Sequence, residues 1–185
     1  MVDPATLSAP GFPRIGDYAL LSDCHTGALA APDGAIEWMC VPRFDSPSVF
    51  AALLDRGAGM FRFAPNETVP VARRYEPGTN ILETTWSTPT GWLVVRDALT
   101  IGPWRARSDD PHTRPPPDLD AERVLVRIAE CVQGEVDIAM SCHPSLDYGR
   151  QAPQWELSDD LHAATTQEDA QLPRLLLVTD LNMGI

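Results

Sequence analysis

The sequence contains no lysine, because all 14 of its basic residues are arginine. This absence excludes Schiff-base chemistry and the lysine of a phosphate-binding P-loop. Basic residues are also few beside the 26 acidic ones, which leaves a formal net charge of −12. A surface that binds duplex nucleic acid needs cationic residues to displace counterions. We therefore expect no nucleic acid partner.

Long hydrophobic runs are missing as well. No uninterrupted apolar stretch approaches the roughly 18 residues that a membrane span needs. Residues 1–13 contain three prolines and lack the apolar centre of a secretory signal, and we interpret them as a flexible N-terminal tail. These absences predict a cytoplasmic protein that has no membrane partner.

Cysteine is too rare for a disulfide scaffold, with 4 residues in 185. Two of them are followed by a histidine, but neighbouring residues on a strand point to opposite faces. Gly57-Ala58-Gly59 lacks the third glycine of a dinucleotide loop. We therefore expect no metal site and no cofactor. The cysteines are interpreted as small buried thiols, and they are Cys24, Cys40, Cys131 and Cys142.

The residues that are plentiful indicate an all-β protein. Hydrophobic residues make up 44% of the chain, enough for a core, and most of the 18 prolines and 12 glycines separate short apolar runs. Alternation of apolar and polar side chains indicates antiparallel sheets with one buried face. The fold we predict is an antiparallel β-sandwich with one short helix, forming one domain over residues 14–185.

Turn residues predict three hairpins. In the first turn, Asp33-Gly34 supplies the positive φ angles that a tight hairpin needs. The predicted hairpins join, in chain order, residues 28–31 to 35–41, residues 80–87 to 92–99, and residues 124–128 to 136–140. A further strand is expected over residues 175–179.

Alternation also predicts which side chains share a face. In the third hairpin, Val126 and Ile128 are expected to face the core and Arg127 the solvent. In the first hairpin, Glu37 is expected on the opposite face from its neighbours. Those neighbours are predicted to share one face, and they are Ile36, Trp38 and Cys40.

One helix is predicted after the first hairpin. Ser46 is a good N-cap, and Pro47 fits the first helical position, where its missing N–H costs nothing. Residues 49–54 carry an apolar stripe at helical spacing, and Gly57 is a suitable end.

Acidic residues occur in three adjacent pairs. Hydrolytic acid–base chemistry needs one carboxyl in an apolar pocket, facing a second carboxyl across the substrate. The pairs lie in polar, loop-like segments, so we interpret them as solvated surface and expect no catalytic residue in this chain. They are Asp109-Asp110, Asp159-Asp160 and Glu168-Asp169.

Residues 38–47 contain the densest candidate site. An indole, a guanidinium and a carboxylate occur there within eight residues. Aromatic faces beside such polar groups suit the C–H faces and hydroxyls of sugars. We therefore name Trp38, Arg43, Phe44 and Asp45 as candidate contacts to a substrate or to another domain. The alternative is structural, with Trp38 in the core and Arg43 paired with Asp45 to fix a corner.

A series of short motifs extends along nearly the whole chain. In order, they are Ile15–Leu20, Asp23–Thr26, Asp33–Trp38, Arg43–Pro47, Phe50–Leu54, Arg73–Tyr75, Pro77–Asn80, Leu82–Thr84, Asp147–Arg150 and Thr179–Asn182. Together these motifs resemble glycoside hydrolase family 15, the bacterial trehalase and glucoamylase-like enzymes.

The resemblance implies a two-part protein. In that family an N-terminal β-sandwich precedes a barrel of paired helices, which hydrolyses α-linked glucosides with inversion and holds both catalytic glutamates. Residues 14–185 match only the sandwich, so the catalytic barrel is absent from this sequence. The family's sandwich would also continue past Ile185.

The resemblance therefore implies a function through a partner. The chain would be the N-terminal sandwich of a hydrolase of trehalose or malto-oligosaccharides, inactive alone. It would pack on the helical catalytic domain and complete the rim of the α-glucoside site. The alternative is a free-standing carbohydrate-binding or adaptor module with no catalytic role.

Overall fold

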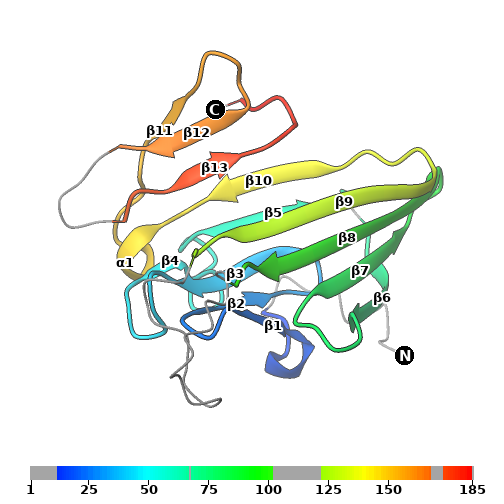
Figure 1. Cartoon of the computed structure of the whole chain (residues 1–185), viewed down its shortest axis with the longest axis horizontal. Helices are drawn as coiled ribbons and strands as arrows, with labels where there is room; N and C mark the ends of the chain where they lie inside the picture. Colours follow the sequence, from blue (N-terminus) through cyan, green and yellow to red (C-terminus); the bar gives the residue numbers. More distant parts are fainter. Residues whose placement is uncertain (1–11, 67, 102–121, 168–172, 185) are drawn as a thin grey trace, which may run out of the picture.

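The computed structural model describes residues 12–66, 68–101, 122–167 and 173–184, and these form three antiparallel sheets (Figure 1). The first sheet has the strand order β1-β2-β3-β5-β10, with β4 beside β3; the second has the order β6-β7-β8-β9, and the third β11-β12-β13. A 3₁₀ turn, η2, precedes β1, and a short helix, α1, follows β10. The elements are η2 (Ile15–Asp17), β1 (Ala19–Ser22), β2 (Gly27–Ala30), β3 (Ala35–Cys40), β4 (Ser48–Phe50), β5 (Met60–Ala64), β6 (Pro70–Tyr75), β7 (Leu82–Ser87), β8 (Gly91–Leu99), β9 (Leu125–Gly134), β10 (Ala139–His143), α1 (Leu146–Gly149), β11 (Trp155–Leu157), β12 (Ala163–Thr166) and β13 (Leu176–Val178).

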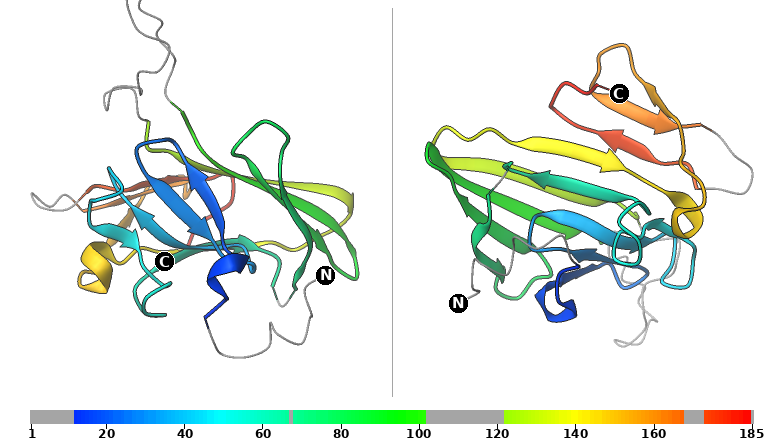
Figure 2. Two further views of the ribbon diagram at one scale, coloured as in Figure 1. Left: turned by 90° about the horizontal axis from the view of Figure 1, so that it is seen from below. Right: turned by 180° about the vertical axis from the view of Figure 1, so that it is seen from behind.

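The first and second sheets stack as the two layers of a sandwich (Figure 2). Their inner faces form one core, against which Leu177 of the third sheet and Leu181, which follows that sheet in the chain, are packed. The predicted all-β sandwich is confirmed. No helix in the described part of the chain is long and apolar enough to cross a membrane. The large side chains of the core include Ile36, Phe61, Phe63, Leu82, Trp86 and Val95.

The first two predicted hairpins are confirmed. β2 pairs with β3 across a turn in which Gly34 has a φ of 81°, and β7 pairs with β8 with Thr84 opposite Val95. A β-carbon at Gly34 would lie 2.9 Å from the β-carbon of Ala64, so this position needs glycine for both its φ and its space. The strand expected over residues 175–179 is β13, which pairs with β12.

The third predicted hairpin is wrong, although both of its strands exist. β9 pairs with β8 in the second sheet, whereas β10 pairs with β5 in the first. The chain therefore crosses from one sheet to the other between Gly134 and Ala139. A turn signal marks where strands end, but consecutive strands do not always pair with each other.

β9 also presents the face opposite to the predicted one. The Arg127 side chain is 3% exposed, whereas Ile128 is 56% exposed. Nε and Nη2 of Arg127 donate to the two carboxylate oxygens of Asp97 at 2.8 and 3.2 Å. Nη1 and Nη2 also donate, each at 2.7 Å, to the carbonyl oxygens of Phe61 and Gly34 in the first sheet. A buried ion pair thus takes the inner position that alternation assigned to apolar residues.

Replacing Arg127 with methionine should lower the free energy of unfolding by about 3–5 kcal/mol, because Asp97 would be left as a buried charge without its partner. Urea denaturation measures this loss. The control is Arg150→Met, since the side chains of the Arg150–Asp147 pair are 73% and 30% exposed. That variant should change stability by no more than about 1 kcal/mol. Equal losses in the two variants would contradict the role of Arg127.

The predicted helix after Ser46 is wrong. Residues 48–50 form β4, and residues 48–52 are all buried. A surface helix would expose one side of this segment, whereas a strand inside the fold can bury both of its faces. Turns follow β4, where the Ala51 N–H donates to the carbonyl oxygens of Ala58 and Gly59. The short helix of the described residues is α1, about 100 residues further on, and within it Asp147 and Tyr148 have positive, non-helical φ angles.

The interpretation of all four cysteines as buried thiols is wrong for two of them. Cys24 and Cys131 are exposed, Cys40 is buried and Cys142 is intermediate. Burial raises the pKa of the Cys40 thiol, and it raises the pKa of Cys142 to about 12. In the part of the chain that the structure describes, no group of three or more His, Cys, Asp or Glu side chains could hold a metal ion.

Cys24 and Cys131 should therefore react with a disulfide reagent much faster than Cys40 and Cys142 in the folded protein. The thiolate is the reacting form, and burial lowers its population. Mass spectrometry of the chain labelled at about pH 8, near the ordinary thiol pKa, identifies the modified residues. In urea all four should react at similar rates. Early labelling of Cys142 in the folded chain would show that its site is open.

The acidic pair Asp159-Asp160 lies at the surface, as expected. Both residues are exposed, and the hydroxyl of Ser158 donates to Asp160 at 2.5 Å, which lowers the pKa of that carboxyl. The other two acidic pairs and residues 1–11 of the predicted tail lie outside the described residues.

Candidate interaction face

A β-bulge in β3 turns Trp38 to the outer face of the first sheet. Ile36 lies opposite Ala30, and Trp38 lies opposite Leu29, so Glu37 is the extra residue between them. Leu29 and Ala30 point to opposite faces, and their partners therefore do so too. Ile36 is fully buried, whereas Trp38 is partly exposed. The prediction that Ile36 and Trp38 share one face is wrong.

Trp38 belongs to a group of apolar and aromatic side chains on this face. Leu20 lies opposite Leu29, and Leu29 opposite Trp38, which places these three together. Phe44 lies over Gly27, where a β-carbon would come within 3.0 Å of the Phe44 ring. Exposed apolar groups gathered in this way mark interaction sites. We call the group the outer-face patch: Leu20 (50% exposed), Leu29, Trp38, Phe44 (59%) and Tyr148 (46%).

The remaining two predicted site residues are in the loop that carries Phe44. Arg43 Nε lies 3.2 Å from Asp45 Oδ1, and their side chains are 56% and 80% exposed. The Phe44 N–H donates to the carbonyl of His25 at 3.0 Å, and the Arg43 N–H donates to Ser46 Oγ at 3.1 Å. The structure thus brings Trp38 and Phe44 onto one face and adds an exposed ion pair beside Phe44.

The buried carboxylate of Glu37, next to Trp38, connects three segments of the chain. The sequence did not predict its burial or its partners. Glu37 is 3% exposed, and its two oxygens accept hydrogen bonds from the Tyr18 hydroxyl and from Arg56, both at 2.5 Å. Burial and the bond to Glu37 raise the pKa of Tyr18, which therefore keeps its proton as a donor. Each partner is 19 residues from Glu37, a distance at which no local pattern connects them.

Tyr148 reaches the patch from a left-handed turn. Asp147, Tyr148 and Gly149 have φ angles of 51°, 59° and 87°, a conformation that costs a residue other than glycine about 1–2 kcal/mol. The Tyr148 N–H donates to Ser48 Oγ at 3.1 Å. The Tyr148 ring centroid lies 6.2 Å from that of Trp38, with the ring planes at 40°. Strain held at two consecutive residues is a mark of functional positions.

Two glycines let this turn pack closely on the loop before β5. A β-carbon at Gly149 would lie 2.8 Å from that of Ala58, and one at Gly59 would lie 2.6 Å from the backbone nitrogen of Ser145. Beside the turn is a cavity of about 380 Å³, whose lining includes Arg56, His143, Ser145 and Trp155. Arg56 thus borders the cavity and also binds Glu37.

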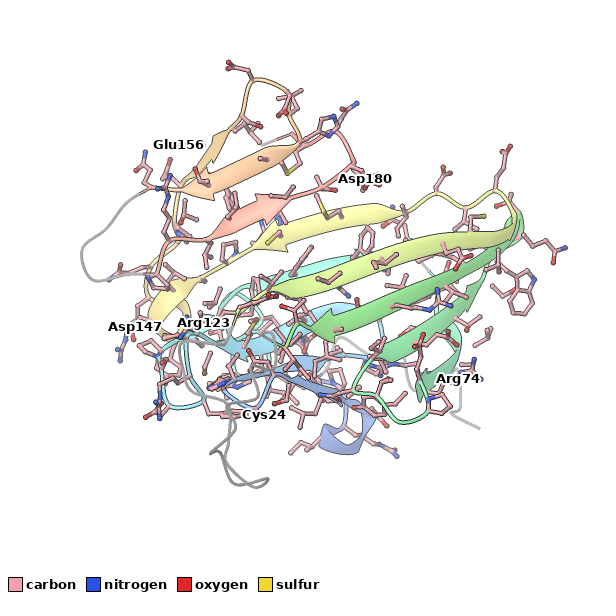
Figure 3. The ribbon with its side chains drawn as sticks, in the orientation of Figure 1. Cys24, Arg74, Arg123, Asp147, Glu156 and Asp180 are labelled. Atoms are coloured by element: carbon pink, nitrogen blue, oxygen red, sulfur yellow. The ribbon has the colours of Figure 1, made fainter. Side chains whose placement is uncertain are left out.

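The outer face of the second sheet carries a network of ion pairs. Arg74 binds Glu83 at 2.7 Å, and Figure 3 shows Arg74 at the opposite end of the molecule from Asp147 of α1. These charges are paired with one another within the sheet, although Glu83 itself is only 7% exposed. The centre of the network is Arg96, which lies 2.9–3.1 Å from Glu76, Glu83 and Glu130.

The fold and this face define the class of protein, an antiparallel β-sandwich domain with a partly apolar outer face. Residues 6–106 match the family described as "Trehalase-like, N-terminal". The chain belongs to this family, and the resemblance found in its motifs is confirmed.

Proteins named trehalase align with nearly all of the chain. It is 51% identical over 190 residues to the trehalase of Mycolicibacterium smegmatis and 51% identical over 182 residues to that of Mycobacterium tuberculosis. These alignments cover 97% and 94% of the chain but 28% and 27% of the two relatives, so the chain spans less than a third of their length. A trehalase of Thermoplasma volcanium is 25% identical over 177 residues. No solved structure matches the chain.

The left-handed turn predicts an unusual order of stability. Tyr148→Gly should be more stable than Tyr148→Ala by about 1 kcal/mol, because only glycine adopts the positive φ without strain. The control is Tyr75, which lies in β6, where glycine should be less stable than alanine by about 0.5–1 kcal/mol. Thermal unfolding of the four variants measures both differences. The same order at both positions would contradict the left-handed conformation of Tyr148.

Proposed function

We propose that the chain is the N-terminal β-sandwich of an α-glucoside hydrolase that acts on trehalose. The alignment supports this proposal, since 97% of the chain is 51% identical to part of a protein named trehalase. The family's name, which places it at the N-terminus, adds to that support. On this proposal the domain extends over residues 14–185, and the hydrolytic residues belong to the larger part of the enzyme.

The part of the outer-face patch around Leu20 and Phe44 packs on the helical catalytic domain, and the part around Trp38 and Tyr148 borders the substrate site. Leu20 and Phe44 each expose about half of their surface, and covering them would remove apolar area from water. Arg43 and Asp45 lie at the rim of this surface, where charged side chains fix orientation more than they add affinity. The other face of the first sheet is already occupied by the core.

The end of β3 and the loop that follows it complete the rim of the sugar site. Trp38, Arg43, Phe44 and Asp45 combine ring faces with a cation and an anion, a set that suits an α-glucoside. Inverting hydrolysis also requires two carboxyls about 6.5–9.5 Å apart across the glycosidic bond. Buried Glu37 and Asp97 each pair with an arginine within the sandwich, which supports a structural role for them. The chain alone is therefore expected to release no glucose.

A hybrid enzyme tests this function. The segment of M. smegmatis trehalase that aligns with this chain is replaced by the chain, and glucose release from trehalose is measured. We expect an active hybrid, because half of the aligned residues are identical. Phe44→Glu in the hybrid should reduce activity at least about tenfold, since an unpaired charge would be buried in the contact. An inactive, folded hybrid would contradict the proposal.

The matched control places the same charge on the other sheet. Ile128 is 56% exposed on the outer face of the second sheet, so Ile128→Glu should leave the activity of the hybrid unchanged. If Ile128→Glu and Phe44→Glu reduce activity equally, the first sheet is not the docking surface. Glucose release by the chain alone, lost on a single substitution in it, would show that hydrolytic residues lie in this domain.

A further inference from the structure

Two separate irregularities of the backbone bring the rings of Trp38 and Tyr148 together. The bulge at Glu37 reverses the alternation of β3 and turns Trp38 away from the core. The left-handed turn at Asp147 and Tyr148 directs the second ring to the same place. The turn does not bury the Tyr148 ring, which remains 46% exposed.

The surrounding structure holds the Tyr148 turn firmly. The Tyr148 N–H is bound by Ser48 Oγ at 3.1 Å, and the Ser145 N–H donates to the carbonyl of Val49 at 3.0 Å. Gly149 packs so closely on Ala58 that no β-carbon would fit. A strained segment persists only where its neighbours over-determine it. The backbone that carries the ring is therefore fixed in the free protein.

The chemistry of the ring pair suits one class of ligand. The two rings lie against each other as a tilted pair, with centroids 6.2 Å apart and planes at 40°; together they present an apolar surface, and the phenol of Tyr148 adds a polar edge. Alongside, Arg150 Nη1 lies 3.1 Å from Asp147 Oδ2, which supplies donors and acceptors at the margin. A hexopyranose has the matching combination of an apolar C–H face and a rim of hydroxyl groups.

We propose that Trp38 and Tyr148 form a binding site for a hexopyranose ring. The identity of the sugar as the glucosyl unit of trehalose rests on the proposed function, whereas the ring pair itself does not. Tyr148 was not among the residues that the sequence singled out as site residues. It supplies the second ring of the site, from α1, beside Trp38 of β3.

Direct titration tests the site in the chain itself. The indole N–H signal of Trp38 is followed by NMR as trehalose is added, with Trp38→Phe used to assign it among the five tryptophans. We expect a saturable shift with millimolar affinity. Sorbitol, an open-chain polyol without a ring face, should not produce it. No shift, or an equal shift with sorbitol, would overturn the proposal.

Variants of Tyr148 distinguish the contribution of its ring to binding from its effect on folding. Tyr148→Ala and Tyr148→Gly should each weaken trehalose binding about tenfold, equivalent to about 1.4 kcal/mol, and the glycine variant does so without left-handed strain. Tyr148→Phe should keep the affinity within about twofold. The matched control is Trp92→Ala, an aromatic residue 41% exposed on the second sheet, which should bind normally. Unchanged binding by Tyr148→Gly would overturn the proposal.

The two proposals can fail separately. Trehalose binding that depends on Tyr148, together with an inactive hybrid enzyme, would keep the sugar site and favour a free-standing carbohydrate-binding module. An active hybrid together with an unresponsive Trp38 signal would keep the proposed function and reject the sugar site.

Discussion

The buried pair of Arg127 and Asp97 holds the two halves of the sandwich together. Both side chains are 3% exposed, and Arg127 also donates to two backbone carbonyls of the opposite sheet. A charge can be buried only when it is paired and its hydrogen bonds are made. Both conditions are met here through the stacking of the sheets, with the guanidinium 4.9 Å from the ring centroid of Phe61. The inner face of the first sheet is therefore covered by the second sheet, whereas its outer face remains available for contact with another molecule.

Side chains also close the β1 edge of the first sheet. The Tyr75 hydroxyl accepts from the Leu20 N–H at 2.8 Å and donates to the Leu20 carbonyl at 2.9 Å, while Asn80 donates to the carbonyl of Ser22. An open edge would be a template for pairing with another chain. Because these groups are satisfied, the β1 edge does not offer them for backbone pairing with another chain.

The candidate site was predictable only in part. Trp38 and Phe44 drew attention because aromatic and charged residues are dense in one short segment. Tyr148 belongs to the motif Asp147–Arg150, but nothing in the sequence placed that motif beside Trp38, since 100 residues separate Tyr148 from Ser48, which binds its backbone. The sequence also did not predict the hydrogen bond from Arg56 to Glu37, because these two residues are not close together in the chain. A local pattern can show which side chains could bind a sugar, but it cannot show which distant segments supply the other walls of the site.

Composition, turn residues and the order of motifs were enough to determine the all-β class, the family and two of the hairpins, because each of these depends on residues close together in the chain. Only the folded arrangement decided that β9 and β10 join different sheets, that Arg127 faces inward and that Trp38 faces outward. The physical reason is that alternation assumes an unbroken strand with an apolar inner face. A single extra residue in β3 reverses the alternation, and the need to pair a buried charge reverses the face of β9.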